Sequence, residues 1–219
     1  MKKTVYAILM WLLALTACTV DSYDKGEGKY SLMQAELVDL AINDQKLAIS
    51  FVTDEGDRYQ LTPPITSSWF QTADTIYRAV LYFNALPEAT AEAVSLGVVP
   101  TLRAIKHGEI EQQPEDPIGV ESAWMSKSRK YINLGLLFKT GQVDGEDGVH
   151  GIGLVLDTIL VNANQTRTAY FRFLHDQTGI PEHYTSRRYV SILLPDTVQL
   201  DTIHLTIPTY DGKIERIFN

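Results

Sequence analysis

The sequence predicts an all-β protein: a small Greek-key, OB-like barrel followed by a β-sandwich. Its 219 residues include 14 Gly, 9 Pro, 11 Tyr and 7 Phe, and few segments show helical spacing of apolar residues. Short runs of β-branched and aromatic residues separated by turn residues favour strands throughout. With 45% hydrophobic and 21% charged residues, the chain has the composition of a globular protein that can bury a core.

The first element, residues 1–18, has the parts of a secretory signal. Lys2 and Lys3 form a basic start, and a mostly apolar run extends from Thr4 to Leu15. A run of this length is shorter than the roughly 20 residues that a helix needs to cross a membrane. We therefore expect a signal peptide rather than a retained transmembrane helix.

Cys18 is the only cysteine and follows Leu15-Thr16-Ala17. This tetrapeptide resembles a bacterial lipobox, which implies cleavage before Cys18 and attachment of a diacylglycerol to its thiol. Two or three acyl chains would give a stable lipid anchor in the membrane. The alternative is an ordinary signal peptide with a cysteine near the cut by chance. The expected localisation is the cell envelope, as an outer membrane lipoprotein that is either periplasmic or surface-exposed.

Residues 19–29 are polar and lack periodicity, so they predict a flexible tether. Asp21 and Asp24 look like a weak surface-export signal, and a plain solvated linker explains them equally well. The chain carries a net charge of −8, and nucleic-acid binding depends on Lys and Arg. No nucleic-acid partner is expected.

Residues 30–106 are expected to form the OB-like barrel. The predicted strands are Ser31–Ile42, Lys46–Thr53, Arg58–Thr62, Thr75–Phe83 and Val94–Ile105. Asp54–Asp57 predicts a hairpin turn, and the Ala- and Glu-rich stretch Leu86–Ser95 predicts one or two helical turns.

Residues 107–117 contain two prolines and four acidic residues, which is typical of a linker between domains. Residues 118–219 then contain seven runs, the number and spacing of a β-sandwich. They are Val120–Met125, Lys130–Phe138, Ile152–Val161, Thr168–Leu174, Arg188–Leu194, Thr202–Pro208 and Ile214–Phe218. Within the fourth run, alternation predicts that Ala169, Phe171, Phe173 and His175 face inward.

The layout resembles the NigD-like lipoproteins of Gram-negative anaerobes. The phrases that carry the resemblance are the lipobox, Tyr30-Ser31-Leu32, Ser122-Ala123-Trp124-Met125-Ser126, Tyr131-Ile132-Asn133-Leu134, His175 after Phe171-Arg172-Phe173-Leu174, and Thr209-Tyr210-Asp211-Gly212. The resemblance covers nearly the whole mature chain and implies the same barrel and sandwich. It also implies a bacteriocin-immunity role, because the family takes its name from a gene beside a bacteriocin gene. It supplies no catalytic residues.

No catalytic residue is predicted from the sequence. Cys18 is expected to carry lipid, and no Gly-x-Ser-x-Gly motif occurs. No cofactor or metal is predicted, because no histidine has a partner at the spacing of local metal-binding pairs. Two alternatives remain open: a metal site assembled from His150, His175 and His204, and a pair of carboxylates placed for glycoside hydrolysis.

The candidate binding residues are Tyr59, Trp69 and Phe70. Aromatic residues in a loop beside a barrel either plug its open end or form a binding surface for a partner, and we favour plugging for Trp69 and Phe70. Trp124 is expected in the core between the two sheets. The basic cluster Lys127, Arg129 and Lys130 is expected to be a solvated loop.

Four Asp-Thr-aliphatic triplets, which resemble the O-glycosylation sites of some Gram-negative anaerobes, also fit turns that lead into strands. They begin at Asp74, Asp157, Asp196 and Asp201.

Two functions are compatible with these patterns. The first is a non-enzymatic binding module at the membrane that recognises an envelope protein or a glycan. The alternative is a hydrolase acting on glycans or peptides, with a site assembled from distant residues.

Overall fold

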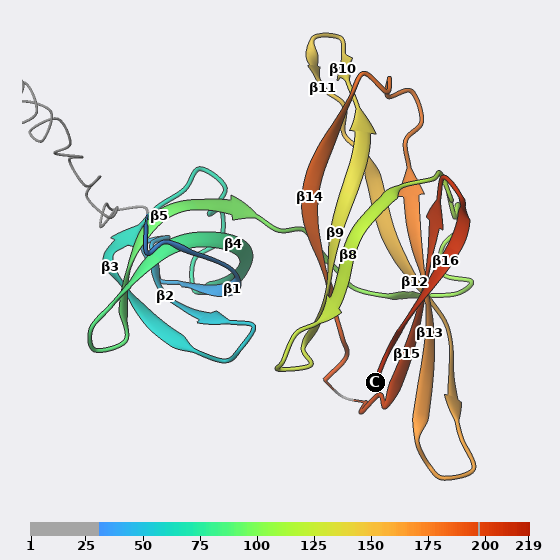
Figure 1. The fold of residues 1–219 in the computed structure, drawn as a ribbon, viewed down its shortest axis with the longest axis horizontal. Coiled ribbons are helices and arrows are strands. Elements are labelled where there is room, and N and C mark those ends of the chain that lie inside the picture. Colours follow the sequence, from blue (N-terminus) through green and yellow to red (C-terminus); the bar gives the residue numbers. More distant parts are fainter. Residues whose placement is uncertain (1–30, 197) are drawn as a thin grey trace, which may run out of the picture. The chain divides into compact units, whose positions relative to one another are not determined.

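The computed structural model describes residues 31–196 and 198–219, which form strands and contain no helix (Figure 1). This confirms the all-β fold class. The predicted signal peptide, Cys18 and the tether lie outside the described residues. Within the described part of the chain, no helix is long and apolar enough to cross a membrane.

The first part of the chain closes into a five-stranded barrel with the order β1-β2-β3-β5-β4. Its strands are β1 (Gln34–Ile42), β2 (Ala48–Thr53), β3 (Arg58–Ile65), β4 (Thr75–Leu86) and β5 (Thr90–Val98). Neighbouring strands are antiparallel except β3 and β5, which pair in parallel. The barrel encloses buried side chains from its strands, with Leu40, Phe51, Leu81 and Phe83 each at most 1% exposed.

The predicted turn at Asp54–Asp57 is confirmed, and it joins the antiparallel strands β2 and β3. The predicted helical turns at Leu86–Ser95 are wrong, because this segment forms the tip of a hairpin and the first half of β5. Glu88 and Ala89 have φ of 58° and 52°, which a helix cannot contain, and Leu86 pairs with Thr90 across the hairpin. Closing the barrel therefore outweighs the helical preference of Ala and Glu.

The second part is a β-sandwich of a five-stranded sheet, β16-β15-β13-β12-β7, and a four-stranded sheet, β6-β14-β9-β8. The strands of these sheets are β6 (Thr101–Leu102), β7 (Ile105–Lys106), β8 (Gly119–Met125), β9 (Tyr131–Thr140), β12 (Gly151–Val161), β13 (Arg167–Asp176), β14 (Tyr184–Leu193), β15 (Thr202–Thr209) and β16 (Gly212–Phe218). Two further short strands, β10 (Gln142–Val143) and β11 (Glu146–Asp147), pair with each other in a hairpin. All seven predicted runs are strands.

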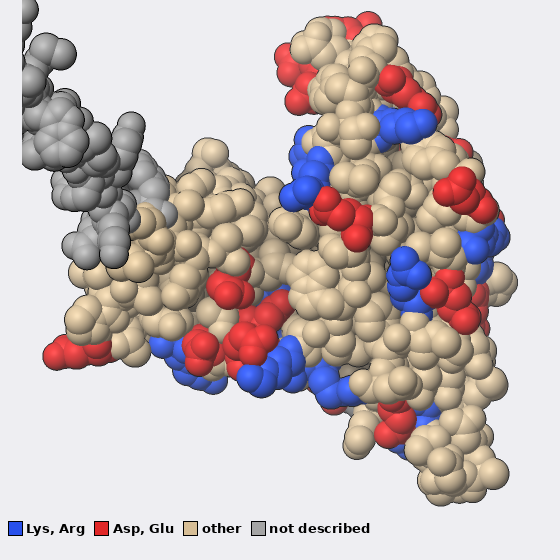
Figure 2. All heavy atoms as spheres, viewed as in Figure 1, with Lys and Arg blue, Asp and Glu red and all other residues tan. Residues whose placement is uncertain are grey.

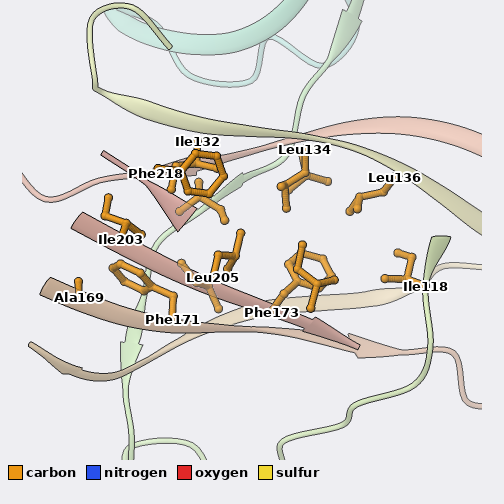
Figure 3. Packing of buried hydrophobic residues seen from close by; sticks show 14 of the residues in the cluster. Ile118, Ile132, Leu134, Leu136, Ala169, Phe171, Phe173, Ile203, Leu205 and Phe218 are labelled. Carbon is orange, nitrogen blue, oxygen red and sulfur yellow. The ribbon is translucent and has the colours of Figure 1, made fainter. Parts of the chain in front are cut away.

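The two sheets bury an apolar core between them (Figure 3). Leu134 and Leu136 of β9 face Phe171 and Phe173 of β13 and Leu205 of β15, and each is at most 3% exposed. At the usual gain of about 1.5–3 kcal/mol for burying a large apolar side chain, such contacts are the main source of stability. The predicted inward alternation along β13 is confirmed, because every second residue from Ala169 to His175 is buried.

The chain joins the sandwich before the predicted linker begins. Thr101–Leu102 pairs with Ser191–Ile192 of β14, and Ile105–Lys106 pairs with Val155–Leu156 of β12. The segment 100–106 therefore crosses from one sheet to the other along one edge of the sandwich. We place the change from barrel to sandwich strands between Val98 and Thr101.

The predicted linker 107–117 is held against the sandwich. The backbone N–H of His175 donates to the carbonyl of Pro114, and that of Asp116 donates to the carbonyl of His175. These bonds extend the sheet at the end of β13, and Ile118 follows as a fully buried residue. Independent folding of residues 30–106 and 118–219 stays a prediction.

Candidate functional site

A buried arginine joins the barrel to the sandwich, which together form one unit, Gln34–Asn219. Arg78 of β4 is 5% exposed, and its Nη2 donates to both carboxylate oxygens of Asp54, at 2.6 and 2.7 Å. Nη1 lies 3.3 Å from Asp39 of β1. Across the junction, Nε donates to Ser191 of β14 at 3.2 Å, and Nη2 also reaches Asn133 of β9 at 3.2 Å.

The polar groups around Arg78 are also bonded to one another. Asn133 donates to Asp54 at 2.7 Å, and the Ser191 hydroxyl donates to Asn133 at 2.8 Å. The ring of Tyr131 lies 4.0 Å from the guanidinium, at cation–π distance. A buried charge is tolerated when it is paired and hydrogen-bonded, as here. We call this network the Arg78 junction and assign it a structural role.

The basic cluster lies in an exposed turn, as expected, and its side chains also contact other parts of the molecule. Lys127 pairs with Glu55 at 2.8 Å, and Lys130 pairs with Asp39 at 2.6 Å. Arg129 donates to the backbone carbonyl of Leu200 at 3.1 Å. Lys130 shares Asp39 with Arg78 and so adjoins the Arg78 junction. On the face in Figure 2, acidic and basic groups lie side by side.

A cleft of about 1140 Å³ lies beside the Arg78 junction, where segment 100–106 crosses the edge of the sandwich. Arg103 and Lys106, both exposed, contribute positive charge. Its apolar lining comes from both parts of the chain. It consists of Ile76, Ala104, Leu156, Ile159, Phe171, Leu193, Leu194 and Pro195.

Some of the cations that line this cleft, which we call the basic cleft, are paired and others are not. Arg78 and Lys130 also line it but are paired with Asp54 and Asp39. Within residues 31–196 and 198–219, Arg103 and Lys106 make no ion pair. The cleft therefore offers two unpaired cations beside an apolar lining. Two exposed carboxylates, Asp74 and Asp196, also line it.

The predicted binding residues lie in the barrel and do not line this cleft. Tyr59 packs against Phe51 and Phe83, with ring centroids 5.1 and 5.4 Å apart. Phe70 is 3% exposed and belongs to the barrel core, with Trp69 packed against it at 4.6 Å. Trp69 and Phe70 therefore pack with the barrel core, and plugging of its open end stays a prediction. A binding role for the three residues stays a prediction.

The expectation that Trp124 lies in the core is wrong. Trp124 is 36% exposed on β8 and meets Tyr189 of β14 edge-on, with centroids 6.2 Å apart. Between them, β9 carries Gly135, which pairs with both Ser122 and Tyr189. Tyr189 thus lies beside this glycine on the sheet, with Trp124 against its ring.

The structure brings together two of the three histidines considered for a metal site. Nδ1 of His150 lies 2.9 Å from Nε2 of His175. His204 lies elsewhere, stacked on Tyr170 at 4.7 Å and 3.0 Å from Glu215. Among the residues that the structure describes, no group of three or more His, Cys, Asp or Glu side chains is placed to hold a metal ion.

Sequence reasoning missed the Arg78 junction and the cleft. Asp54 was recognised only as a turn residue, and Asn133 and Ser191 lie in strands where nothing local marks them. The one available signal is Arg78, a long cation inside the apolar strand Thr75–Phe83. Its partners come from sequence positions up to 113 residues away, so only the fold shows them.

The fold and its site define a class of protein: a closed β-barrel fused through a buried polar junction to a β-sandwich. The model of the NigD-like C-terminal beta sandwich domain matches residues 100–218, more than half of the chain. The chain therefore belongs to the NigD-like family. The match begins where the chain enters the sandwich sheets.

Solved structures from Bacteroides and Parabacteroides species share this fold. A NigD-like immunity protein from Bacteroides caccae is 21% identical with a TM-score of 0.63, over 84% of this chain and 91% of that one. A "Putative TOXIN related protein" from Parabacteroides distasonis is 16% identical with a TM-score of 0.63, over 85% and 92%. A "Putative lipoprotein" from Bacteroides fragilis is 13% identical with a TM-score of 0.56, over 85% and 96%. No curated protein matches the chain.

Proposed function

We propose that this protein is an outer membrane lipoprotein, anchored through Cys18, that acts without turnover by binding a protein partner in its basic cleft. The observation that carries the proposal is a large cleft with an apolar lining in which Arg103 and Lys106 are unpaired and four cations outnumber the two carboxylates, Asp74 and Asp196. A matching partner presents acidic and apolar side chains on one exposed segment. Complementary charge raises the association rate and excludes unlike partners.

The anchor is supported by the sequence Leu15-Thr16-Ala17-Cys18 and by the structural neighbour from Bacteroides fragilis that is described as a lipoprotein. Changing Cys18→Ala should abolish palmitate incorporation and leave an uncleaved or soluble form. Recovery of normally labelled, membrane-bound protein from this variant would contradict the anchor.

A protein partner is favoured over a glycan by the dimensions and chemistry of the cleft. A cleft of about 1140 Å³ with an aliphatic lining suits several amino-acid side chains better than the polar face of a sugar. The neighbour from Bacteroides caccae is described as an immunity protein, a description that we take to indicate action on another protein. We extend that mode of action to this chain.

The proposal is tested by affinity purification of the full-length protein from its native envelope. The charge-reversal variant Arg103→Glu/Lys106→Glu should lose a partner that the unaltered protein retains. The matched control is Arg58→Glu/Arg216→Glu, which makes the same charge change at two exposed positions outside the cleft. Retention of every partner by the cleft variant, or equal loss in both variants, would refute binding in the cleft.

A further inference from the structure

A second pocket opens in the sandwich edge, separate from the basic cleft. It measures about 430 Å³, within the range of small-molecule sites. Pro100 lines this pocket and Thr101 lines the cleft, so segment 100–106 borders both openings. The floor of the pocket is apolar, because Phe138 and Val190 belong to the sandwich core and Ile152 packs against it. The other lining residues are Asp147, Gly148, Val149, His150 and Arg188.

Arg188 lies on the face of β14 that is directed toward the other sheet. Val190 and Ile192 lie on this same face, because side chains alternate along a strand, and each is 1% exposed. Arg188 also pairs with Leu136 of β9, a fully buried core residue, and directly opposite residues of antiparallel strands share a face. Arg188 itself is exposed, so its cation borders the opening of the pocket and is not enclosed by the core.

Arg188 is the only residue of the pocket lining that carries a positive charge near neutral pH. His150 also lines the pocket, but burial lowers its pKa, and the neighbouring His175 and Arg188 lower it further. Within residues 31–196 and 198–219, Arg188 makes no ion pair. The pocket therefore combines an apolar floor with a cation that has no carboxylate partner in the described part of the chain.

One carboxylate, that of Asp147, shares the pocket lining with Arg188. It accepts a hydrogen bond from the hydroxyl of Tyr184 at 3.0 Å, and no ion pair joins it to Arg188 among the residues that the structure describes. A negative charge in the lining opposes an anionic ligand, whereas Arg188 attracts one. The two residues should therefore change the affinity for an anion in opposite directions.

We infer that this pocket, the Arg188 pocket, binds a small organic acid whose carboxylate pairs with Arg188 and whose apolar body lies on the floor of the pocket. A planar guanidinium can donate two parallel N–H bonds to one carboxylate, which gives a strong and specific pair. The apolar body gains by leaving water for the surface of Phe138, Ile152 and Val190. This site does not depend on the protein partner proposed for the basic cleft.

The test uses phenylacetate as the probe and phenylacetamide as its uncharged partner of nearly the same shape. Full-length protein is placed in phospholipid nanodiscs, and equilibrium dialysis at neutral pH measures the binding of each probe. Empty nanodiscs report how much of each probe enters the lipid. Phenylacetate should bind about tenfold more tightly than phenylacetamide, the effect of one charge-assisted pair.

Two neighbouring arginines on the same strand provide the variant and its matched control. In Arg188→Gln, the two probes should bind equally. Arg187 lies on the opposite face of β14, pairs with Glu121 at 2.6 Å and does not line the pocket. In Arg187→Gln, which makes the same charge change, the preference for phenylacetate should therefore persist.

A change of opposite sign and a change in the cleft complete the test. Asp147→Asn removes the opposing charge and should tighten phenylacetate binding about threefold, without affecting phenylacetamide. Arg103→Glu/Lys106→Glu should leave the preference intact, which separates this site from the basic cleft. Equal binding of both probes to the unaltered protein, no binding of either, or a preference that survives in Arg188→Gln would overturn the proposal.

Discussion

At the scale of single residues, the structure depends on a few polar groups that the fold takes out of water. Arg78 exposes 3% of its side chain yet carries a full charge that Asp54 and Asp39 neutralise. Removing one partner of a buried ion pair leaves the other charge uncompensated, which costs more than the pair itself contributes. We therefore expect substitution of Arg78 to lower the free energy of unfolding more than substitution of any other residue.

Changing Arg78→Met should lower the free energy of unfolding by about 3 kcal/mol, because Asp54 keeps a charge that nothing balances. Denaturant unfolding of the full-length protein measures the loss. The control is Lys127→Met, which removes a highly exposed ion pair with Glu55 at the same junction and should leave stability nearly unchanged. Equal effects of the two changes would contradict the structural role of Arg78.

The lowered pKa of His150 makes stability depend on pH in a definite direction. The unfolded chain binds a proton at the ordinary histidine pKa of about 6.5, while the folded protein resists it until lower pH. The free energy of unfolding should therefore fall as the pH drops from about 6.5 through the lowered pKa. Changing His150→Phe should remove this component from a series of unfolding measurements. An unchanged pH profile would mean that His150 titrates normally.

At the scale of strands, alternation of apolar and polar residues predicted much of the sandwich. The run from Thr168 to Leu174 has the inward aromatic face that the sequence shows, because side chains alternate across any strand. Local composition did not predict strands whose pairing partners lie far away in the sequence. Residues 101–106 belong to the sandwich because β14 and β12 bind them, and nothing in their own sequence specifies those partners.

The exposed faces were harder to predict than the core. Trp124 was expected in the core, yet it lies 36% exposed against the ring of Tyr189. The pairing of Tyr59 with Phe51 follows from the hairpin that joins their strands. By contrast, the two openings in the sandwich edge depend on where segment 100–106 crosses, and the sequence carries no sign of this.

Gly135 should be intolerant of a side chain. A Cβ at this position would collide with the hydroxyl of Ser122 and meet the ring of Tyr189 at 3.6 Å. Changing Gly135→Ala should lower the free energy of unfolding by about 1–3 kcal/mol, the usual cost of overpacking. At Gly153, on β12, the added methyl group would meet only Leu174, at ordinary contact distance. A Gly153→Ala variant as unstable as Gly135→Ala, measured by thermal unfolding, would show that the collision is not the cause.

At the scale of the whole molecule, the barrel and the sandwich are joined by two ion pairs from the turn between β8 and β9 and by hydrogen bonds of Arg78. Lys130 and Lys127 form ion pairs with Asp39 and Glu55 of the barrel. Arg78 of the barrel donates hydrogen bonds to side chains of β9 and β14. Such a junction fixes the barrel beside the edge of the sandwich where segment 100–106 crosses. The basic cleft thereby acquires lining residues from both parts of the chain, including Ile76.

The central claim is that a partner occupies this cleft, and site-specific photocrosslinking in cells tests it most directly. At the test position, a photoreactive amino acid replaces Ile76, which is 61% exposed and lines the cleft. At the control position, it replaces Ile217 of β16, which is 53% exposed and lies outside the cleft. We predict a defined crosslinked product from position 76 that is absent from position 217. That product should disappear when Arg103→Glu/Lys106→Glu is added and persist with Arg58→Glu/Arg216→Glu. The same product from both positions, or one that survives reversal of the cleft charges, would contradict the account.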